Sequence, residues 1–108
     1  MADLKVLIAI ANSSMELEKY LRKNELTDIE VNELFVIFLS ENQTKLAKLI
    51  HKFCKKLNLR YNDDAPLKAA CVRGNLDGIK FIYESCQELQ KEKPLEALFT
   101  IAEKCKHK

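Results

Sequence analysis

Apolar residues recur along most of this chain at the spacing of one face of an α-helix. In residues 46–57 they stand at positions i, i+3, i+4, i+7 and i+11, with lysines between them: Leu46, Leu49, Ile50, Phe53 and Leu57. This pattern predicts an amphipathic helix of about three to four turns. Short polar breaks at 12–14, 41–43 and 73–75 divide the chain into about seven helices joined by short turns.

Local capping signals predict where individual helices begin. Thr27 and Glu30 have capping-box spacing, which predicts a helix from about Asp28. Asp64, two residues before Pro66, has the pattern of an N-cap followed by proline in the first turn. These signals predict two helices from different parts of the chain.

The two ends of the chain are also predicted to be helical. Pro94 marks the start of a last helix over 94–106, and residues 4–11 are almost entirely apolar. Residues 4–11 resemble a strand in composition, but they run into a helical pattern over 15–21, which favours a helical hairpin. No segment is a convincing strand, and we therefore expect an all-α fold.

Pairs of helices recur along the sequence at a fixed interval. Four matched positions lie 33 residues apart: Leu34 and Leu67, Asn42 and Asn75, Leu46 and Ile79, Leu49 and Ile82. Flanking segments keep the same hydrophobic roles at offsets of about 28–30 residues. A helical hairpin repeated at this interval predicts a stack of similar units.

Residues 65–82, APLKAACVRGNLDGIKFI, resemble the ankyrin-repeat signature, TPLHxAA followed by a turn glycine and an aliphatic helix. Pro66, Leu67 and Gly74 match it, and Ala70 and Cys71 stand at its small positions. The resemblance implies a short α-solenoid of about seven antiparallel helices in three to four ankyrin-like hairpins. It implies one domain over 1–108, with units at about 3–24, 28–57 and 65–89 and a capping helix at 94–106. A generic helical repeat or bundle is the alternative.

Charge is distributed unevenly along the chain. The net charge is +2, but residues 1–36 carry seven acids and four bases (−3), while residues 37–61 carry one acid and six bases (+5). Five lysines of that middle segment form a predicted basic edge: Lys45, Lys48, Lys52, Lys55 and Lys56. Such an edge suits phosphates, anionic lipid or an acidic protein, although lysine-rich helix faces are often only solvated.

Catalytic and metal-binding motifs are absent from the sequence. There are two histidines, with no nucleophile elbow, no HExxH and no glycine-rich phosphate loop. His51 and Cys54 at i, i+3, with Cys105 and His107, offer a possible zinc set, but packed thiols and a solvated histidine explain them more simply. We therefore expect no enzyme, cofactor or metal.

The cellular setting is inferred from cysteine usage and from the chain's start. Four cysteines without a CxxC pair favour reduced, packed thiols. Residues 1–11 lack the features of a signal peptide, and no apolar run is long enough to span a membrane. These features predict an intracellular, cytoplasmic protein.

The ankyrin resemblance implies binding to another protein, possibly an acidic one. Residues 57–65 would project as a finger, with Tyr61 either an exposed anchor or packed on its neighbour. The predicted partner contacts are Phe35, Arg60, Tyr61, Asp64, Lys68 and Arg73. The alternative is a module that binds nucleic acid or an anionic surface through a basic helix at 45–60. The partner, the oligomeric state and whether the chain is a fragment stay open.

Overall fold

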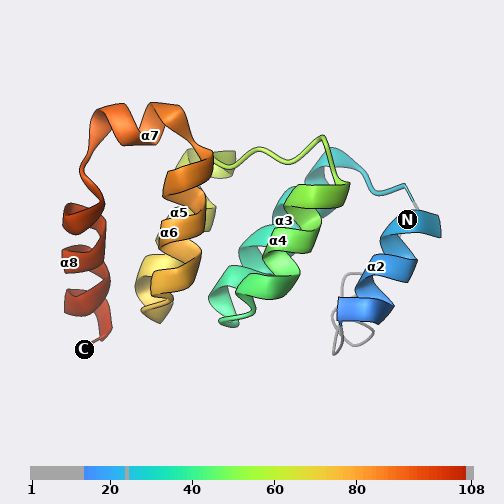
Figure 1. Cartoon of the computed structure of the whole chain (residues 1–108), viewed down its shortest axis with the longest axis horizontal. Helices are drawn as coiled ribbons and strands as arrows, with labels where there is room; N and C mark the ends of the chain where they lie inside the picture. Colours follow the sequence, from blue (N-terminus) through green and yellow to red (C-terminus); the bar gives the residue numbers. More distant parts are fainter. Residues whose placement is uncertain (1–13, 24, 107–108) are drawn as a thin grey trace.

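The computed structural model describes residues 14–23 and 25–106, and every regular element in this part of the chain is a helix. The helices are α2 (Ser14–Lys23), α3 (Asp28–Ser40), α4 (Thr44–Phe53), α5 (Tyr61–Arg73), α6 (Leu76–Ser85), α7 (Gln87–Glu92) and α8 (Leu95–Lys106) (Figure 1). The all-α prediction is confirmed. The helix predicted at 4–11 lies outside the described residues.

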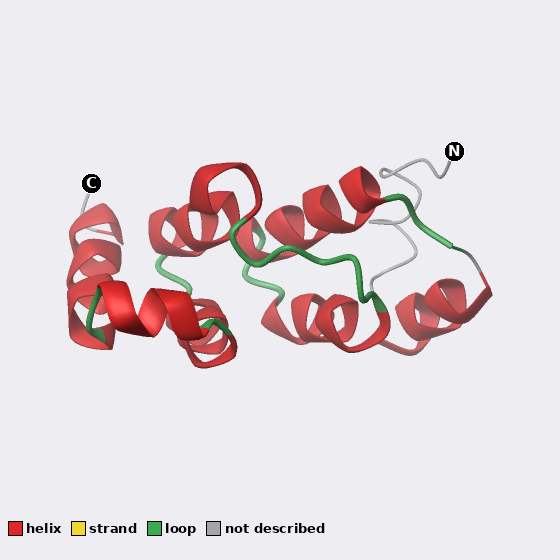
Figure 2. Cartoon of the chain, turned by 90° about the horizontal axis from the view of Figure 1, so that it is seen from above, coloured by secondary structure: helices red, strands yellow, loops and turns green. Residues whose placement is uncertain are grey.

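The helices are arranged in two rows, as the view from above shows (Figure 2). In one row α3 packs against α5, and α5 packs against α8. In the other row α2 packs against α4, while α6 contacts both α5 and α8. The result is an elongated array of 39 × 28 × 21 Å, with α2 at one end and α8 at the other (Figure 1).

A continuous apolar core lies between the two rows. Its most deeply buried large side chains are Leu17, Val31, Leu34, Phe35, Leu39, Ile50, Ile79, Ile82, Leu89 and Leu98. Phe35 is 0% exposed. The prediction that Phe35 contacts a partner is therefore wrong, because a side chain enclosed by the core cannot reach another molecule.

Two predicted helix starts agree with the structure. Helix α3 begins at Asp28 with a complete capping box. The backbone N–H of Glu30 donates to Thr27 Oγ1 at 3.2 Å, and that of Thr27 donates to Glu30 Oε1 at 2.9 Å. Helix α8 begins at Leu95, immediately after Pro94. In both cases the residue that satisfies or removes a free N–H fixes the first turn.

Helix α4 is shorter than predicted. It ends at Phe53, so Lys55 and Lys56 lie in the turn that follows and not on a helix spanning 45–60. The chain leaves the helix because the 57–58 segment is held by α3. The backbone N–H of Asn58 donates to Oδ1 of the buried Asn32 at 2.8 Å. Leu57 still packs against the core, but from the connection.

The start of α5 contains three consecutive left-handed residues. Asn62, Asp63 and Asp64 have φ values of 52°, 57° and 62°, so the right-handed helix begins only after them. The predicted capping role of Asp64 is wrong. Its two carboxylate oxygens accept hydrogen bonds from Arg60 at 2.7 and 2.9 Å.

The α3–α4 and α5–α6 hairpins have matching patterns of buried residues at an offset of 32 residues, and the predicted 33-residue pairs are one position out of register. At 32 residues, buried Phe35 matches Leu67 and buried Ile50 matches Ile82. The same offset relates further buried pairs: Leu34 and Pro66, Phe38 and Ala70, Leu39 and Cys71, Ala47 and Ile79. The 33-residue offset matches identical residues, Leu34 with Leu67 and Asn42 with Asn75, whereas the 32-residue offset matches buried positions.

The turns inside the two hairpins follow the same offset. Asn42 and Gly74 are the left-handed residues, with φ of 62° and 71°. The N–H of the next residue returns to the first helix in both cases: Gln43 to the Phe38 carbonyl at 2.7 Å, and Asn75 to the Ala70 carbonyl at 2.8 Å. These bonds satisfy carbonyls at the helix end, as in a Schellman closure.

Gly78 is required by a close approach and not by its own backbone angles. A Cβ atom there would lie 2.7 Å from Asn75 Nδ2 and 2.9 Å from Leu39 Cδ2. Asn75 is only 3% exposed, and its Oδ1 accepts from the Gly78 N–H at 3.0 Å. The absence of a side chain at position 78 therefore lets α6 lie against this buried cap.

Two further expectations concern thiols and membranes. Cys54, Cys71 and Cys86 are reduced and form no disulfide. Among the described helices, none combines the length and apolar composition needed to cross a membrane.

Candidate functional site

Arg60 and Asp64, two predicted partner contacts, are joined to each other and to α7. Arg60 pairs with both oxygens of Asp64 and also with Glu92, and Glu88 lies 3.7 Å from the guanidinium. These hydrogen bonds hold the pKa of Asp64 and of Glu92 below the usual range and raise the pKa of Arg60. The three groups form an internal clasp, in which the charges of Arg60 and Asp64 are already paired within the chain.

The other predicted contacts on the finger divide into bound and exposed groups. The Tyr61 hydroxyl donates to Glu33 Oε1 at 2.9 Å, a bond that raises the pKa of the phenol. Lys68 is exposed and pairs with Asp63 at 3.1 Å. Arg73 is exposed at the end of α5. Of these three, Lys68 and Arg73 are open to solvent, while Tyr61 is half-buried and bound within the chain.

The five lysines of the basic edge are all exposed. Lys48 Nζ lies 5.7 Å from the centre of the Phe81 ring, and Lys56 Nζ lies 3.8 Å from Glu25 and 3.9 Å from Asp28. Exposed ion pairs at such distances contribute little stability and exchange readily with solvent. The edge therefore stays available to another anionic molecule.

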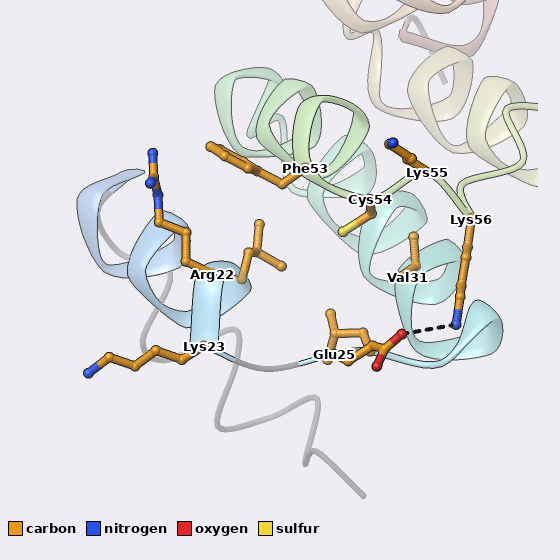
Figure 3. Close-up of a pocket in the computed structure, with 10 residues that line it drawn as sticks. Arg22, Lys23, Glu25, Val31, Phe53, Cys54, Lys55 and Lys56 are labelled. Carbon is orange, nitrogen blue, oxygen red and sulfur yellow. Dashed lines mark ion pairs between the residues drawn. The ribbon is translucent and has the colours of Figure 1, made fainter.

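A groove lies between the end of α2, the start of α3 and the end of α4 (Figure 3). Its volume is about 470 Å³. The floor is apolar and consists of Leu21, Leu26, Val31, Phe53 and Cys54. The rim carries four cations, Arg22, Lys23, Lys55 and Lys56, and one carboxylate, Glu25. Four positive charges against one negative give the rim a net charge of +3.

Phe53 is the aromatic side chain of this groove, and two cations lie near its ring. Arg22 Cζ lies 5.4 Å and Lys52 Nζ 5.5 Å from the ring centre. The ring is half-buried. Cys54 beside it is half-buried, and burial raises the pKa of its thiol. At neutral pH this thiol behaves as a small apolar group.

Sequence analysis found Lys55 and Lys56 but missed the α2 side of the groove. Arg22 and Lys23 occupy the last turn of α2, where basic residues are common because they oppose the helix dipole. Their role in the groove depends on the packing of α2 against α4. The only signal in the sequence was the recurrence of paired helices, which predicts that neighbouring units touch.

The possible zinc ligands are not assembled in the described residues. His51 is exposed and its ring packs edge-on against Phe81, with centroids 5.3 Å apart. Among the side chains that the structure describes, no three His, Cys, Asp or Glu groups could together hold a metal ion. Cys105 and His107 lie outside those side chains.

An apolar floor surrounded by cations suits a ligand that is anionic and partly apolar. Side chains at the rim can pair with carboxylates or phosphates, while the floor excludes water from an apolar group. No family model matches the chain, and no match was found among the curated proteins or the solved structures compared with it. A proposal of function therefore has to rest on the groove and the basic edge.

Proposed function

We propose that the chain is a non-catalytic, intracellular module that binds another protein with an acidic surface. The observation that carries this proposal is the exposed basic edge, which continues at Lys55 and Lys56 into the groove beside α2. Of the other charged residues predicted as contacts, Arg60 and Asp64 pair with each other within the chain, while Lys68 and Arg73 are exposed. We further propose that the stacked hairpins serve as an ankyrin-like scaffold.

The arrangement supports protein recognition for two physical reasons. Helices packed in rows present a surface that is ordered before binding, so little conformational entropy is lost on association. The groove has an apolar centre and a charged rim, the usual anatomy of a protein interface. Its rim lysines would favour an acidic partner and speed encounter at low salt.

The second candidate is binding of nucleic acid or an anionic surface through the same lysines. The observation in its favour is the exposure of Lys45, Lys48 and Lys52 along α4. Single-stranded nucleic acid is usually held by free aromatic faces as well as by charge. Here Phe53 and Phe81 are partly buried and lie beneath lysines. Protein recognition is therefore the preferred proposal.

A capture experiment with matched variants tests the proposal. The purified chain is immobilised, exposed to cell extract at low and high salt, and the retained protein and nucleic acid are identified. The edge variant is Lys48→Glu/Lys52→Glu/Lys55→Glu. The control variant is Lys80→Glu/Lys91→Glu/Lys104→Glu, which changes the same charge at exposed sites on α6, α7 and α8.

We expect a discrete protein to be retained by the wild type and the control variant and lost by the edge variant. Direct binding of that protein in purified form completes the test. Retention that is equal in both variants would contradict a role for the basic edge. Retention of nucleic acid alone, falling steeply with salt, would replace the proposal with the second candidate.

A further inference from the structure

We propose that the groove between α2 and α4 binds an acidic segment of the partner in which an apolar side chain lies between carboxylates. This inference rests on the proposed function and specifies its ligand. The apolar side chain occupies the floor beside Phe53, and the carboxylates pair with cations of the rim. The partner is thus recognised by a short motif and not only by its net charge.

The size and lining of the groove fit a side chain. A volume of about 470 Å³ lies within the range of sites that enclose small ligands. Leu21, Leu26 and Val31 offer no hydrogen-bonding side-chain group, so a polar ligand atom placed on this floor would lose water without gaining a partner. An apolar group loses nothing there and is favoured by about 25 cal/mol per Å² buried.

Part of the positive charge at the rim is not paired with any acidic side chain of the described residues. Within residues 14–23 and 25–106, no ion pair involves Lys23, Lys52 or Lys55. Arg22 pairs with Glu18 at 2.8 Å on α2 itself. Lys56 turns toward Glu25 across one side of the groove (Figure 3). The upper side, near Phe53 and Lys55, is therefore the place where added carboxylates gain most.

Phe53 provides the second, independent observation that the groove is a docking site. Arg22 and Lys52 both lie near its ring, so a carboxylate at the ring edge would be within reach of two cations. The ring is half-buried, which leaves part of its surface open to contact with an incoming apolar group.

A protein segment fits these observations better than a phosphate or a base. A phosphate would pair with the rim but leave the apolar floor unfilled. A base carries polar ring atoms, which would lose water on the apolar floor without gaining a hydrogen-bond partner. Only a ligand that carries apolar and anionic groups close together uses both parts of the groove.

Fluorescence anisotropy with synthetic peptides tests the inference. The probe is a labelled peptide of about a dozen residues with leucine and phenylalanine flanked by glutamate and aspartate. One matched peptide has the acids replaced by glutamine and asparagine, and another has the apolar residues replaced by serine. We expect saturable binding of the probe and at least tenfold weaker binding of each matched peptide.

Protein variants locate the binding. Lys52→Glu/Lys55→Glu is expected to weaken probe binding at least tenfold, while Lys80→Glu/Lys104→Glu, with the same charge change on α6 and α8, leaves it within about twofold. Phe53→Ala is expected to weaken it similarly, and its circular dichroism spectrum checks that the helices still form. Amide shifts on probe binding should centre on Leu26, Val31 and Cys54.

The outcomes separate this inference from the proposed function. Equal binding of the probe and the serine-substituted peptide would overturn the groove and leave a purely electrostatic edge. Amide shifts centred outside the groove, or Phe53→Ala binding as well as wild type, would also overturn it. If no peptide binds but the edge variant still loses a captured protein, the groove inference fails and the proposed function stands. Competition by an oligonucleotide at high salt would contradict both.

Discussion

The α3–α4 and α5–α6 hairpins have matching buried positions and matching turns 32 residues apart, but different side chains hold them. The first turn uses Asn42 as its left-handed residue, and Gln43 makes no capping bond to α4. The second turn uses Gly74, and Asn75 caps α6 through the Gly78 N–H. A turn of the same type can therefore be formed by different side chains.

The polar cap of the second hairpin also reaches the first. Asn75 Oδ1 accepts from Thr44 Oγ1 at 3.0 Å, and Asn75 Nδ2 donates to the Leu39 carbonyl at 3.4 Å. The first hairpin relies on bulk instead, with Phe35 and Phe38 where the second has Leu67 and Ala70. The difference teaches that one unit supplies volume and the other supplies the buried hydrogen bonds that fix their relative position.

The largest expected effect comes from removing the bulk. Phe35→Ala should lower the free energy of unfolding by about 3–5 kcal/mol, because it leaves a large cavity in the core. Leu67→Ala, at the matched position but 7% exposed, should cost about 2–3 kcal/mol. Urea unfolding followed by circular dichroism measures both. Equal losses would show that the two hairpins share the core volume evenly.

The next largest effect concerns the cap. Asn75→Ala should lower the free energy of unfolding by about 1–2 kcal/mol, because the Gly78 N–H and the Leu39 carbonyl lose a partner inside the protein. Gln43→Ala is the matched control, since Gln43 makes no capping bond with its side chain, and should change it by less than about 0.5 kcal/mol. A large loss in the control would remove the contrast between the turns.

Gly78→Ala tests the comparison between the hairpins, because its effect on the free energy of unfolding should change sign when Asn75 is also replaced. In the wild type, Gly78→Ala should destabilise, because the new Cβ would meet Asn75 Nδ2 at 2.7 Å and outweigh alanine's better helix propensity. With Asn75→Ala already present, the nearer obstacle is gone. The same substitution should then recover up to about 1 kcal/mol. A double-mutant cycle by urea unfolding checks it, and additive effects would refute the packing explanation.

The smallest expected effect lies in the connections after the hairpins, where Arg60 and Glu92 stand 32 residues apart and pair with each other. The pKa values of Asp64 and Glu92 are lowered in the folded state, so their stabilisation is present above the unfolded values near 4 and is lost as pH falls through the folded values. Arg60→Gln should therefore lower the urea midpoint at pH 7 and matter less at pH 3. An equal effect at both pH values would contradict the clasp.

Local signals in the sequence predicted the helical architecture well. The capping box at Thr27 and the glycine at position 74 act through neighbouring backbone groups, and both appear as predicted. The end of α4 was not predictable in this way, because the apolar spacing continues to Leu57 and the chain is diverted by a distant partner, Asn32. The offset was misjudged by one residue because burial, and not residue identity, defines equivalent positions.

The candidate site was only half predictable. The exposed lysines of α4 follow from its amphipathic pattern. The groove needs α2 beside α4, and the pairing of Arg60 with Glu92 needs α7 beside residues 57–65. Both depend on contacts between segments far apart in the sequence. The sequence pattern therefore predicted the exposed lysines but not the groove in which a ligand could meet them.

The three left-handed residues at 62–64 limit which amino acids can occupy these positions if the fold is to be kept. Three successive positions with φ above 50° accept glycine, asparagine or aspartate with little strain and disfavour β-branched residues strongly. Neutral drift is therefore expected to exchange these three amino acids among themselves while the exposed helix faces vary freely. Relatives with low overall sequence identity to this chain should therefore still carry glycine, asparagine or aspartate at these three positions.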